Sequence, residues 1–416
     1  MRRIRHIAAA GCAALLLTLS CEGWLDGDYP FGQNRSLISN GSDHFFHTLP
    51  EQEEEKEERH TPHCYFSAVE FPQGYNWKRD SAGGQVPCRI VLFKDGDRIL
   101  ELAVRPDGPS ADPDMHRIVG GHLYTDYCTA EETIVGKDGT ELFRYPGRES
   151  LRGFCVDAAG KVHTLGQSRN GQGFSYRIDG EPVLSRSTGF VFGSPGAGPG
   201  LRDGALSRDE EGRFCFAFAD GAGHGWIWQG GELQEVMLAG AGSVYDLRPV
   251  RGSPVAAFEG DGFYLMEGNR LFQPTDLKVF EARIVSDGNG EYRIAARLRN
   301  RDGTKRDAWL TADGIQRTYR EYDGRMELVL YDGQDGFVAM DSGGKVTAIR
   351  GLEAEVETVE AGRYLLISPA CIWMDGEEAF VALSGDPDVG AGPQVWHGGE
   401  WLSILLNGYL TGITYE

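Results

Sequence analysis

Short apolar runs separated by glycine-bearing turns recur along most of the chain. The stretch Leu151–Ser187 shows this pattern most clearly, because it divides into four runs of apolar or alternating residues and the first three end on turns that contain glycine. Runs of this length and alternation predict β-strands, and the turns between them predict hairpins. The repeating unit is therefore a group of four short antiparallel strands.

The hairpin between the third and fourth strands marks each repeat. In every case an apolar run enters a turn at a glycine, namely at Gly96, Gly139, Gly180, Gly231, Gly268, Gly314, Gly351 and Gly399. Asp-Gly and Gly-Gly pairs at several of these positions supply the positive φ that tight hairpins require. The mean spacing of about 43 residues is typical of the blades of a propeller.

These repeats predict an all-β fold, a β-propeller made of four-stranded blades. Eight turns predict eight blades, with seven as the alternative because the third run in Met326–Ala361 is short. The first unit lacks an innermost strand, whereas Gly408–Tyr415 is left over after the last hairpin. We therefore expect the C-terminal strand to pair into the first blade and close the ring, which would hide two exposed strand edges.

The N-terminus has the pattern of a secretory signal. Three arginines among the first five residues precede the apolar run Ile7–Leu19, which is too short to span a bilayer as a helix. The sequence Leu17–Cys21 resembles the lipobox of bacterial lipoproteins, with Thr18 where that family usually has leucine. The resemblance implies a signal peptide over residues 1–20 and lipidation of Cys21; the alternative is an ordinary cleaved signal peptide.

Residues 21–61 are polar and contain the acidic run Glu51–Arg59, which predicts a solvated, flexible tether. Acidic residues soon after Cys21 resemble the export tags of surface lipoproteins in Bacteroidetes-like bacteria. Turns of the form Asp-x-x-Gly, such as Asp157–Gly160, Asp209–Gly212 and Asp287–Gly290, resemble those of many secreted propeller families. We expect a propeller domain over 62–416, carried by a cell-envelope or outer-membrane lipoprotein that faces the periplasm or the cell surface.

The charge of the chain limits its partners. Its 416 residues carry a formal net charge of −21, and loss of the arginine-bearing signal segment would make it more acidic. Such a surface repels phosphate backbones, so nucleic acid is excluded as a partner. We expect a monomer that meets the membrane only through its lipid.

Six cysteines follow the signal region, and none forms a C-x-x-C pair. Most of them lie inside apolar strand runs, which favours buried free thiols. A disulfide between Cys64 and Cys88 is left open, because connectivity does not follow from sequence.

Loop lengths point to one face of the predicted propeller. The turns between first and second strands and between third and fourth strands are all tight. The long insertions fall in the other class of connection, which shares the opposite face: 72–87, 105–117, 188–202, 297–307 and 383–394. Loops on a rigid scaffold commonly carry function, so this face is the predicted binding face.

Candidate ligand-binding residues lie in or beside these connections: Tyr75, Trp77, Lys78, Arg79, Asp112, Asp114, His116, Arg169, Phe190, Phe192, His224, Arg299, Asp386 and Asp388. Aromatic side chains beside hydrogen-bonding groups suit a carbohydrate or a peptide. The acids near Asp112 do not have the spacing of an EF-hand calcium loop, and we expect neither a metal nor a cofactor.

Motifs of known catalytic classes are missing from the sequence, including G-x-S-x-G and H-E-x-x-H,. We therefore expect a non-catalytic propeller that binds a glycan, peptide or protein. The alternative is a glycoside hydrolase or lyase with acidic residues at the channel mouth, because a pair of carboxylates is recognised only in three dimensions.

Overall fold

The computed structural model describes residues 63–416 except for 81–85, 170–172, 190, 192–205, 210, 221, 241, 287–290, 323–325, 331–335, 342–344, 351–354, 361–363, 366–368, 376–377 and 398–399. These residues belong to the unit Thr61–Glu416. The predicted signal peptide and tether lie outside the described residues. None of the described segments forms a helix long and apolar enough to cross a membrane.

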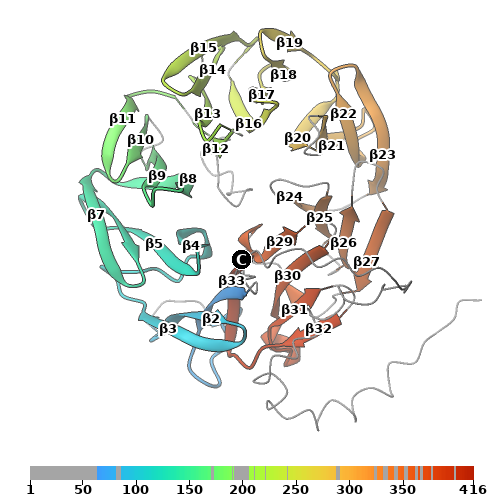
Figure 1. Ribbon diagram of the computed structural model, residues 1–416. Coiled ribbons are helices and arrows are strands. Elements are labelled where there is room, and N and C mark those ends of the chain that lie inside the picture. The colour runs from blue at the N-terminus through green and yellow to red at the C-terminus, as the bar shows by residue number, and fades with distance from the viewer. Residues whose placement is uncertain are drawn as a thin grey trace, which may run out of the picture. The chain divides into compact units, whose positions relative to one another are not determined.

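The fold is all-β, and within the described residues its strands pair into eight antiparallel sheets (Figure 1). The first sheet has the order β3-β2-β1-β33 and comprises β1 (Cys64–Glu70), β2 (Arg89–Lys94), β3 (Asp97–Ala103) and β33 (Gly408–Tyr415). The second comprises β4 (His116–Val119), β5 (His122–Cys128), β6 (Glu132–Lys137) and β7 (Thr140–Pro146). The third comprises β8 (Glu149–Val156), β9 (Val162–Ser168), β10 (Phe174–Ile178) and β11 (Glu181–Arg186).

The next three sheets follow the same order along the chain. The fourth comprises β12 (Ser207–Arg208), β13 (Phe214–Ala219), β14 (His224–Gln229) and β15 (Glu232–Met237). The fifth comprises β16 (Ser243–Val250), β17 (Ser253–Glu259), β18 (Phe263–Glu267) and β19 (Arg270–Phe272). The sixth comprises β20 (Lys278–Ser286), β21 (Tyr292–Arg299), β22 (Lys305–Thr311) and β23 (Gly314–Tyr322).

The last two sheets include residues 326–361, where the third apolar run of the repeat is short. The seventh has four strands, β24 (Met326–Leu330), β25 (Gly336–Asp341), β26 (Lys345–Arg350) and β27 (Glu355–Glu360). The eighth has five, β28 (Tyr364–Leu365), β29 (Ile372–Asp375), β30 (Glu378–Gly385), β31 (Gln394–His397) and β32 (Glu400–Ser403). Both β28 and β29 pair with β30, so two short strands take the place of one inner strand. The described segments also contain the short 3-10 helices η2 (Pro113–Met115), η3 (Pro369–Cys371) and η4 (Pro387–Val389).

The glycine turns adopt the backbone conformation that the sequence predicts. Asp95 and Gly96, between β2 and β3, have φ angles of 52° and 90°. The Asp-Gly pairs at Gly139 and Gly180 repeat this geometry, with the aspartate at φ 50° in both. Positive φ at both central residues is the requirement of a type I′ hairpin turn. Gly351 and Gly399 lie outside the described residues.

Neighbouring sheets share hydrophobic clusters, because side chains alternate between the two faces of each strand. In β2, Ile90 and Leu92 pack against the second sheet, whereas Val91 and Phe93 pack against the eighth. Four further clusters join the second sheet to the third, the third to the fourth, the fourth to the fifth and the fifth to the sixth. Both faces of the first five sheets are therefore buried, which explains the continuous apolar runs in their sequence.

Strand β13 divides its residues by size between its two faces. Phe214, Phe216 and Phe218 belong to the cluster shared with the third sheet. Cys215, Ala217 and Ala219 belong to the cluster shared with the fifth. The two faces of one strand thus present three phenyl rings and three small side chains.

The C-terminal strand completes the first sheet. β33 pairs antiparallel with β1 from Cys64↔Tyr415 to Glu70↔Gly408. The pairing continues past the strand end, because His63 and Glu416 exchange backbone hydrogen bonds of 2.6 and 3.0 Å. Residues at the two ends of the folded unit therefore form neighbouring strands.

One sequence prediction needs correction, and one question that the sequence left open is answered. The stretch 297–307 is not a long insertion, because β21 and β22 extend into it and Arg297 pairs with Asp307, leaving only residues 300–304 as a loop. The Cys64–Cys88 disulfide does not form. Cys64 starts β1, whereas Cys88 precedes the residue that pairs with Glu70 at the other end of β1.

Cys64 and Cys88 are therefore about 20 Å apart along the strand direction, at roughly 3.3 Å per residue. A disulfide tolerates a Cα distance of only about 7 Å. Among the described residues, Cys64 and Cys88 are both free cysteines.

A test of the β1–β33 pairing follows from Gly408. A Cβ at this position would lie 1.8 Å from the Val69 carbonyl oxygen, which is backbone and cannot rotate away. We expect Gly408→Ala to destabilise the fold by about 3 kcal/mol, measured by denaturant or thermal unfolding. Gly392→Ala is the control, because its nearest atom would be 3.7 Å away; equal stability of the two variants would contradict the packing described.

Candidate functional site

The loop between β1 and β2 begins with a turn organised by Asn76. Its Oδ1 atom accepts hydrogen bonds from the backbone N–H groups of Lys78 (3.0 Å) and Arg79 (3.1 Å). The Asn76 N–H in turn donates to Asp80 Oδ2 at 2.9 Å. Asparagine commonly holds a turn in this way, and here the turn leaves the side chains of Lys78 and Arg79 exposed.

Four of the predicted site residues form ion pairs with one another across two loops. Lys78 Nζ lies 2.6 Å from Asp386 Oδ2 and 3.5 Å from Asp388 Oδ2. Arg79 Nε lies 2.6 Å from Asp388 Oδ1. The hydrogen bond from Lys78 lowers the pKa of Asp386, so this carboxyl stays ionised and paired. These four charges join the loops rather than remaining available to a ligand.

Asn407, just before β33, attaches a third segment to the same loop. Its Nδ2 atom donates to the carbonyl oxygens of Phe71, Pro72 and Tyr75. Next to it the Trp77 ring meets the ring of Tyr409 edge-on, with centroids 5.2 Å apart. Tyr75 stacks on Phe71 at 5.0 Å and donates its hydroxyl hydrogen to Asp80 O at 2.5 Å. Trp77 and Tyr75 are both half-buried.

A groove of about 570 Å³ lies where the three segments meet. It is lined by Gln73–Trp77, Pro387, Gly390–Pro393 and Leu405–Gly408. The residues that line it are aromatic, apolar, or polar without a charge. Leu405 is 89% exposed. The groove offers aromatic rings on which a ligand can stack and amide groups that can form hydrogen bonds with it.

Asp112, Asp114 and His116 form a second group, at the connection between β3 and β4. Asp112 caps η2 by accepting a hydrogen bond from Asp114 N at 3.1 Å. His116 Nε2 donates to the carbonyl oxygen of Ser110 at 2.7 Å, which leaves Nδ1 as an acceptor. Burial lowers the pKa of His116 to about 4, so this histidine is neutral at pH 7.

The Asp114 carboxyl has a raised pKa. Protein atoms around it and the charge of Asp112 raise the pKa to about 6, against the opposing effects of Arg117 and Arg152. The neighbouring Asp126 is fully buried and accepts a hydrogen bond from Arg117 at 2.5 Å. Burial likewise raises the pKa of Asp126, so two carboxyls of raised pKa lie near each other; carboxyls of raised pKa are the groups that general acid catalysis uses.

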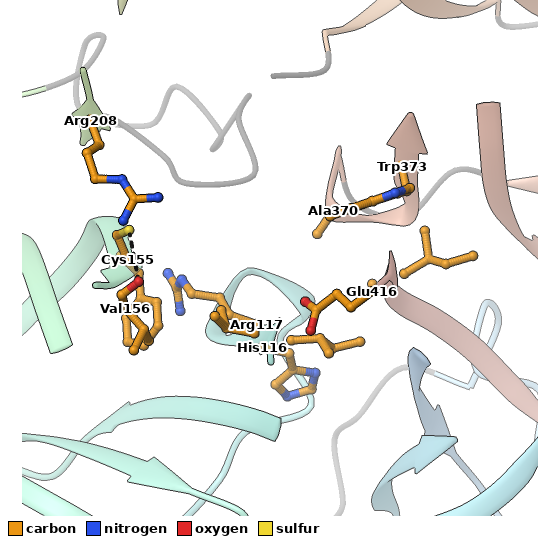
Figure 2. A pocket seen from close by; sticks show the side chains of 13 residues that line it. His116, Arg117, Cys155, Val156, Arg208, Ala370, Trp373 and Glu416 are labelled. Carbon is orange, nitrogen blue, oxygen red and sulfur yellow. Dashed lines mark hydrogen bonds between the residues drawn. The ribbon is translucent and has the colours of Figure 1, made fainter. Parts of the chain in front are cut away.

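A second cavity, of about 320 Å³, lies among inner strands of several sheets (Figure 2). It is lined by His116–Val119, Phe154–Val156, Arg208, Ala370, Trp373, Gly412, Ile413 and Glu416. Figure 2 shows Arg117, Arg208 and Glu416 entering it from three different strands or strand ends. It shares no lining residue with the groove.

The remaining predicted residues are spread over other parts of the fold. Arg169 acts electrostatically on Asp126, which associates it with the second group. His224 pairs with Glu235 at 2.6 Å in the fourth sheet, and Arg299 ends β21 in the sixth. Phe190 and Phe192 lie outside the described residues, and among those described no group of three or more His, Cys, Asp or Glu side chains is placed to hold a metal ion.

Sequence reasoning missed the residues that complete both sites. Tyr409 was assigned only to the closing strand, and Asn407, the residue before that strand, was not selected, although an asparagine beside an aromatic strand is a signal that could have been used. Arg208 and Glu416 had no local signal, because neither lies in a long connection and their common cavity depends on the arrangement of whole sheets.

Comparisons with known proteins give matches of low identity. No protein-family model matches the chain, and a comparison with curated protein sequences found no match. Among solved structures, the computationally designed protein Ika8 is 11% identical, with 80% of this chain and 96% of that chain covered and a TM-score of 0.48.

Two bacterial proteins give similar values. Apo AztD from Citrobacter koseri is 11% identical, with 85% and 98% covered and a TM-score of 0.44. BamB from Moraxella catarrhalis is 10% identical, with 80% and 97% covered and a TM-score of 0.45. Because these TM-scores are below 0.5, the matches carry no argument about this chain, and its fold is described from its own strand pairing.

The pKa of Asp114 predicts a pH-dependent effect of its substitution. The folded-state value of about 6 lies above the unfolded value of about 3.9, so the native state binds this proton more tightly. The stability gained is complete below pH ~4 and is lost as the pH rises through ~6. Asp114→Asn should therefore melt about 1–2 °C above the wild type at pH 7, and the difference should vanish by pH ~4.

Asp302→Asn is the matched control, because hydrogen bonds from Thr304 lower the pKa of Asp302. It should melt below the wild type at pH 7. A Tm difference for Asp114→Asn that does not change between pH 4 and pH 7 would refute the assigned pKa.

Proposed function

We propose that the chain is a lipid-anchored, eight-bladed propeller that binds a glycan in the groove between Trp77 and Leu405. Eight sheets in chain order, of which the first packs against both the second and the eighth, support the propeller architecture. The pairing of β33 with β1 supports ring closure by the C-terminal strand. Seven blades would leave one of the eight sheets without a place in the ring.

The neutral aromatic lining of the groove carries the ligand assignment. Sugar rings stack on aromatic side chains and take directional hydrogen bonds from amide groups. Trp77 and Tyr75 supply the rings, and Gln73, Asn76 and Asn407 supply amides. Because Lys78 and Arg79 are already paired with Asp386 and Asp388, the groove favours a neutral glycan over a charged peptide.

The test is a glycan array followed by a solution measurement of affinity with the best array ligand. Trp77→Ala should weaken binding at least tenfold, because loss of one stacking surface removes about 1.5 kcal/mol. Trp226→Ala is the control, since this tryptophan lies in β14 and stacks on Phe218 away from the groove. Equal affinities of the Trp77→Ala variant and the wild type, or binding of peptides alone, would overturn the assignment.

A second function is favoured by the pKa of Asp114. Asp114, whose pKa is raised to about 6, lies near Asp112, and a carboxyl of raised pKa near a second carboxyl resembles the pair of acids in a glycoside hydrolase. Product analysis of the array ligand separates the two functions. Release of reducing ends that Asp114→Asn abolishes would assign hydrolysis, whereas binding without turnover supports the groove as a binding site.

The anchor rests on the segment Leu17–Cys21, outside the described residues. A lipid on Cys21 would hold the propeller at the cell envelope, with residues 22–61 as a spacer. We expect Cys21→Ala to move the protein from the membrane fraction to the soluble fraction of a bacterial host that processes lipoproteins. A Cys88→Ala variant is the control, and membrane retention of Cys21→Ala would refute lipid anchoring at this residue.

A further inference from the structure

The turn that carries Trp77 is held by a single carboxylate from another loop. Asp388 Oδ1 accepts a hydrogen bond from Asn76 Nδ2 at 2.8 Å and lies 2.6 Å from Arg79 Nε. Its second oxygen, Oδ2, lies 3.5 Å from Lys78 Nζ. Asp388 thus contacts the residues on both sides of Trp77, whose side chain lines the groove.

Asp388 has a well-defined position of its own. Its backbone N–H donates to Asp386 Oδ1 at 2.9 Å, and this hydrogen bond caps η4. Pro387, between the two acids, lines the groove, and the proline ring fixes its φ angle. A capped turn with a central proline therefore presents the carboxylate of Asp388 from a rigid support.

The first half of the β1–β2 loop is held by a different residue. Asn407 donates to the carbonyl oxygens of Pro72 and Tyr75, which precede the turn. Asp388 contacts the residues that follow them. Asn407 therefore holds the start of the loop, and Asp388 holds the turn that carries Trp77.

These contacts matter more for the order of the groove than for the stability of the fold. Lys78 and Arg79 are 39% and 68% exposed, and exposed ion pairs add little to the free energy of unfolding. They nevertheless hold the Trp77 ring at the position where it meets Tyr409, with centroids 5.2 Å apart. A site that is ordered before its ligand arrives avoids the entropy cost of ordering it on binding.

We propose that Asp388 is the positioning residue of the groove: through Asn76 and Arg79 it holds the Trp77 ring against Tyr409 before a ligand binds. This inference rests on the proposed glycan-binding function. It has an unusual consequence for regulation of the site. Because salt screens exposed ion pairs, the affinity of the groove for a glycan without charge should fall as the salt concentration rises.

The position of the ring can be tested without a ligand, by fluorine NMR of the full chain labelled with 5-fluorotryptophan. The chain contains eight tryptophans, and Trp77→Phe identifies the Trp77 signal by its loss. In Asp388→Ala this signal should move toward that of free 5-fluorotryptophan, because the ring leaves the magnetic environment of Tyr409. The melting temperature should stay within about 2 °C of the wild type. An unmoved signal would overturn the proposal.

Asp388→Asn is the conservative second variant. Its side chain keeps an oxygen that accepts hydrogen bonds from Asn76 and Arg79, but it loses the negative charge. The Trp77 signal should therefore return at least halfway from its position in Asp388→Ala to its position in the wild type. Equal displacement of the signal in the two variants would contradict positioning through these hydrogen bonds.

Affinity for the best array ligand tests the effect on binding. Asp388→Ala should weaken binding about fivefold, as expected if about one molecule in five keeps the ordered turn. Raising NaCl from about 20 mM to about 1 M should weaken binding of an uncharged glycan by the wild type about threefold, and Asp388→Ala should lose most of this dependence. Unchanged affinity in Asp388→Ala would overturn the proposal.

Asp276→Asn is the matched control for both measurements. It removes an exposed ion pair of 2.7 Å with Arg301, in the connection between β19 and β20. Its Trp77 signal, affinity and salt dependence should equal those of the wild type. Equal changes in Asp276→Asn and Asp388→Ala would refute a specific role for Asp388.

The two measurements also separate this inference from the proposed function. If no glycan binds but Asp388→Ala displaces the Trp77 signal, the glycan assignment fails and the positioning role stands. If Trp77→Ala weakens glycan binding but Asp388→Ala changes neither the signal nor the affinity, the groove binds glycans and the positioning role fails.

Discussion

The pairing of β33 with β1 is the interaction on which the rest of the structure depends. It gives the first sheet its innermost strand and satisfies the backbone groups along one edge of β1,. It also places Leu410 and Ile413 in the cluster between the first and eighth sheets. Because the paired strands come from opposite ends of the folded unit, this contact closes a loop that contains nearly the whole domain, and it carries a correspondingly large loop-closure entropy cost.

Both candidate sites are built around this strand. Asn407, just before it, and Tyr409, near its beginning, contact the loop that carries Trp77. Gly412 and Ile413, within it, and Glu416, just after it, line the second cavity. The segment 407–416 thus contributes to the groove at its beginning and to the second cavity at its end. The ion pairs between Lys78 and the Asp386 loop support the same arrangement from the outside, where exposed charges stabilise little by themselves but restrict the geometry of a loop.

The sequence predicted local structure well and long-range charge pairing poorly. Hairpin turns could be placed because Asp-Gly pairs encode positive φ locally, as at Gly96 and Gly139, and strands could be placed because their alternation is local too. The loop 297–307 was mistaken for an insertion, since Arg297 and Asp307 are charged yet pair within the sheet. Lys78 and Asp386 were both selected as site residues. Their ion pair could not be predicted, because 308 positions separate them and neither loop has a pattern that indicates the pairing. Arg208 lines a cavity together with residues from several other sheets. No single stretch of sequence could predict this environment.

The division of side chains by size in β13 has a consequence for folding errors. A repeat array is prone to strands that pair one residue out of step, because each sheet resembles the next. Such a slip in β13 would turn Phe214, Phe216 and Phe218 toward the space now filled by Cys215, Ala217 and Ala219, and would leave voids on the opposite side. Overpacking and cavity formation would then penalise the same mistake at once. The alternation of large and small side chains in β13 therefore disfavours pairing that is one residue out of register.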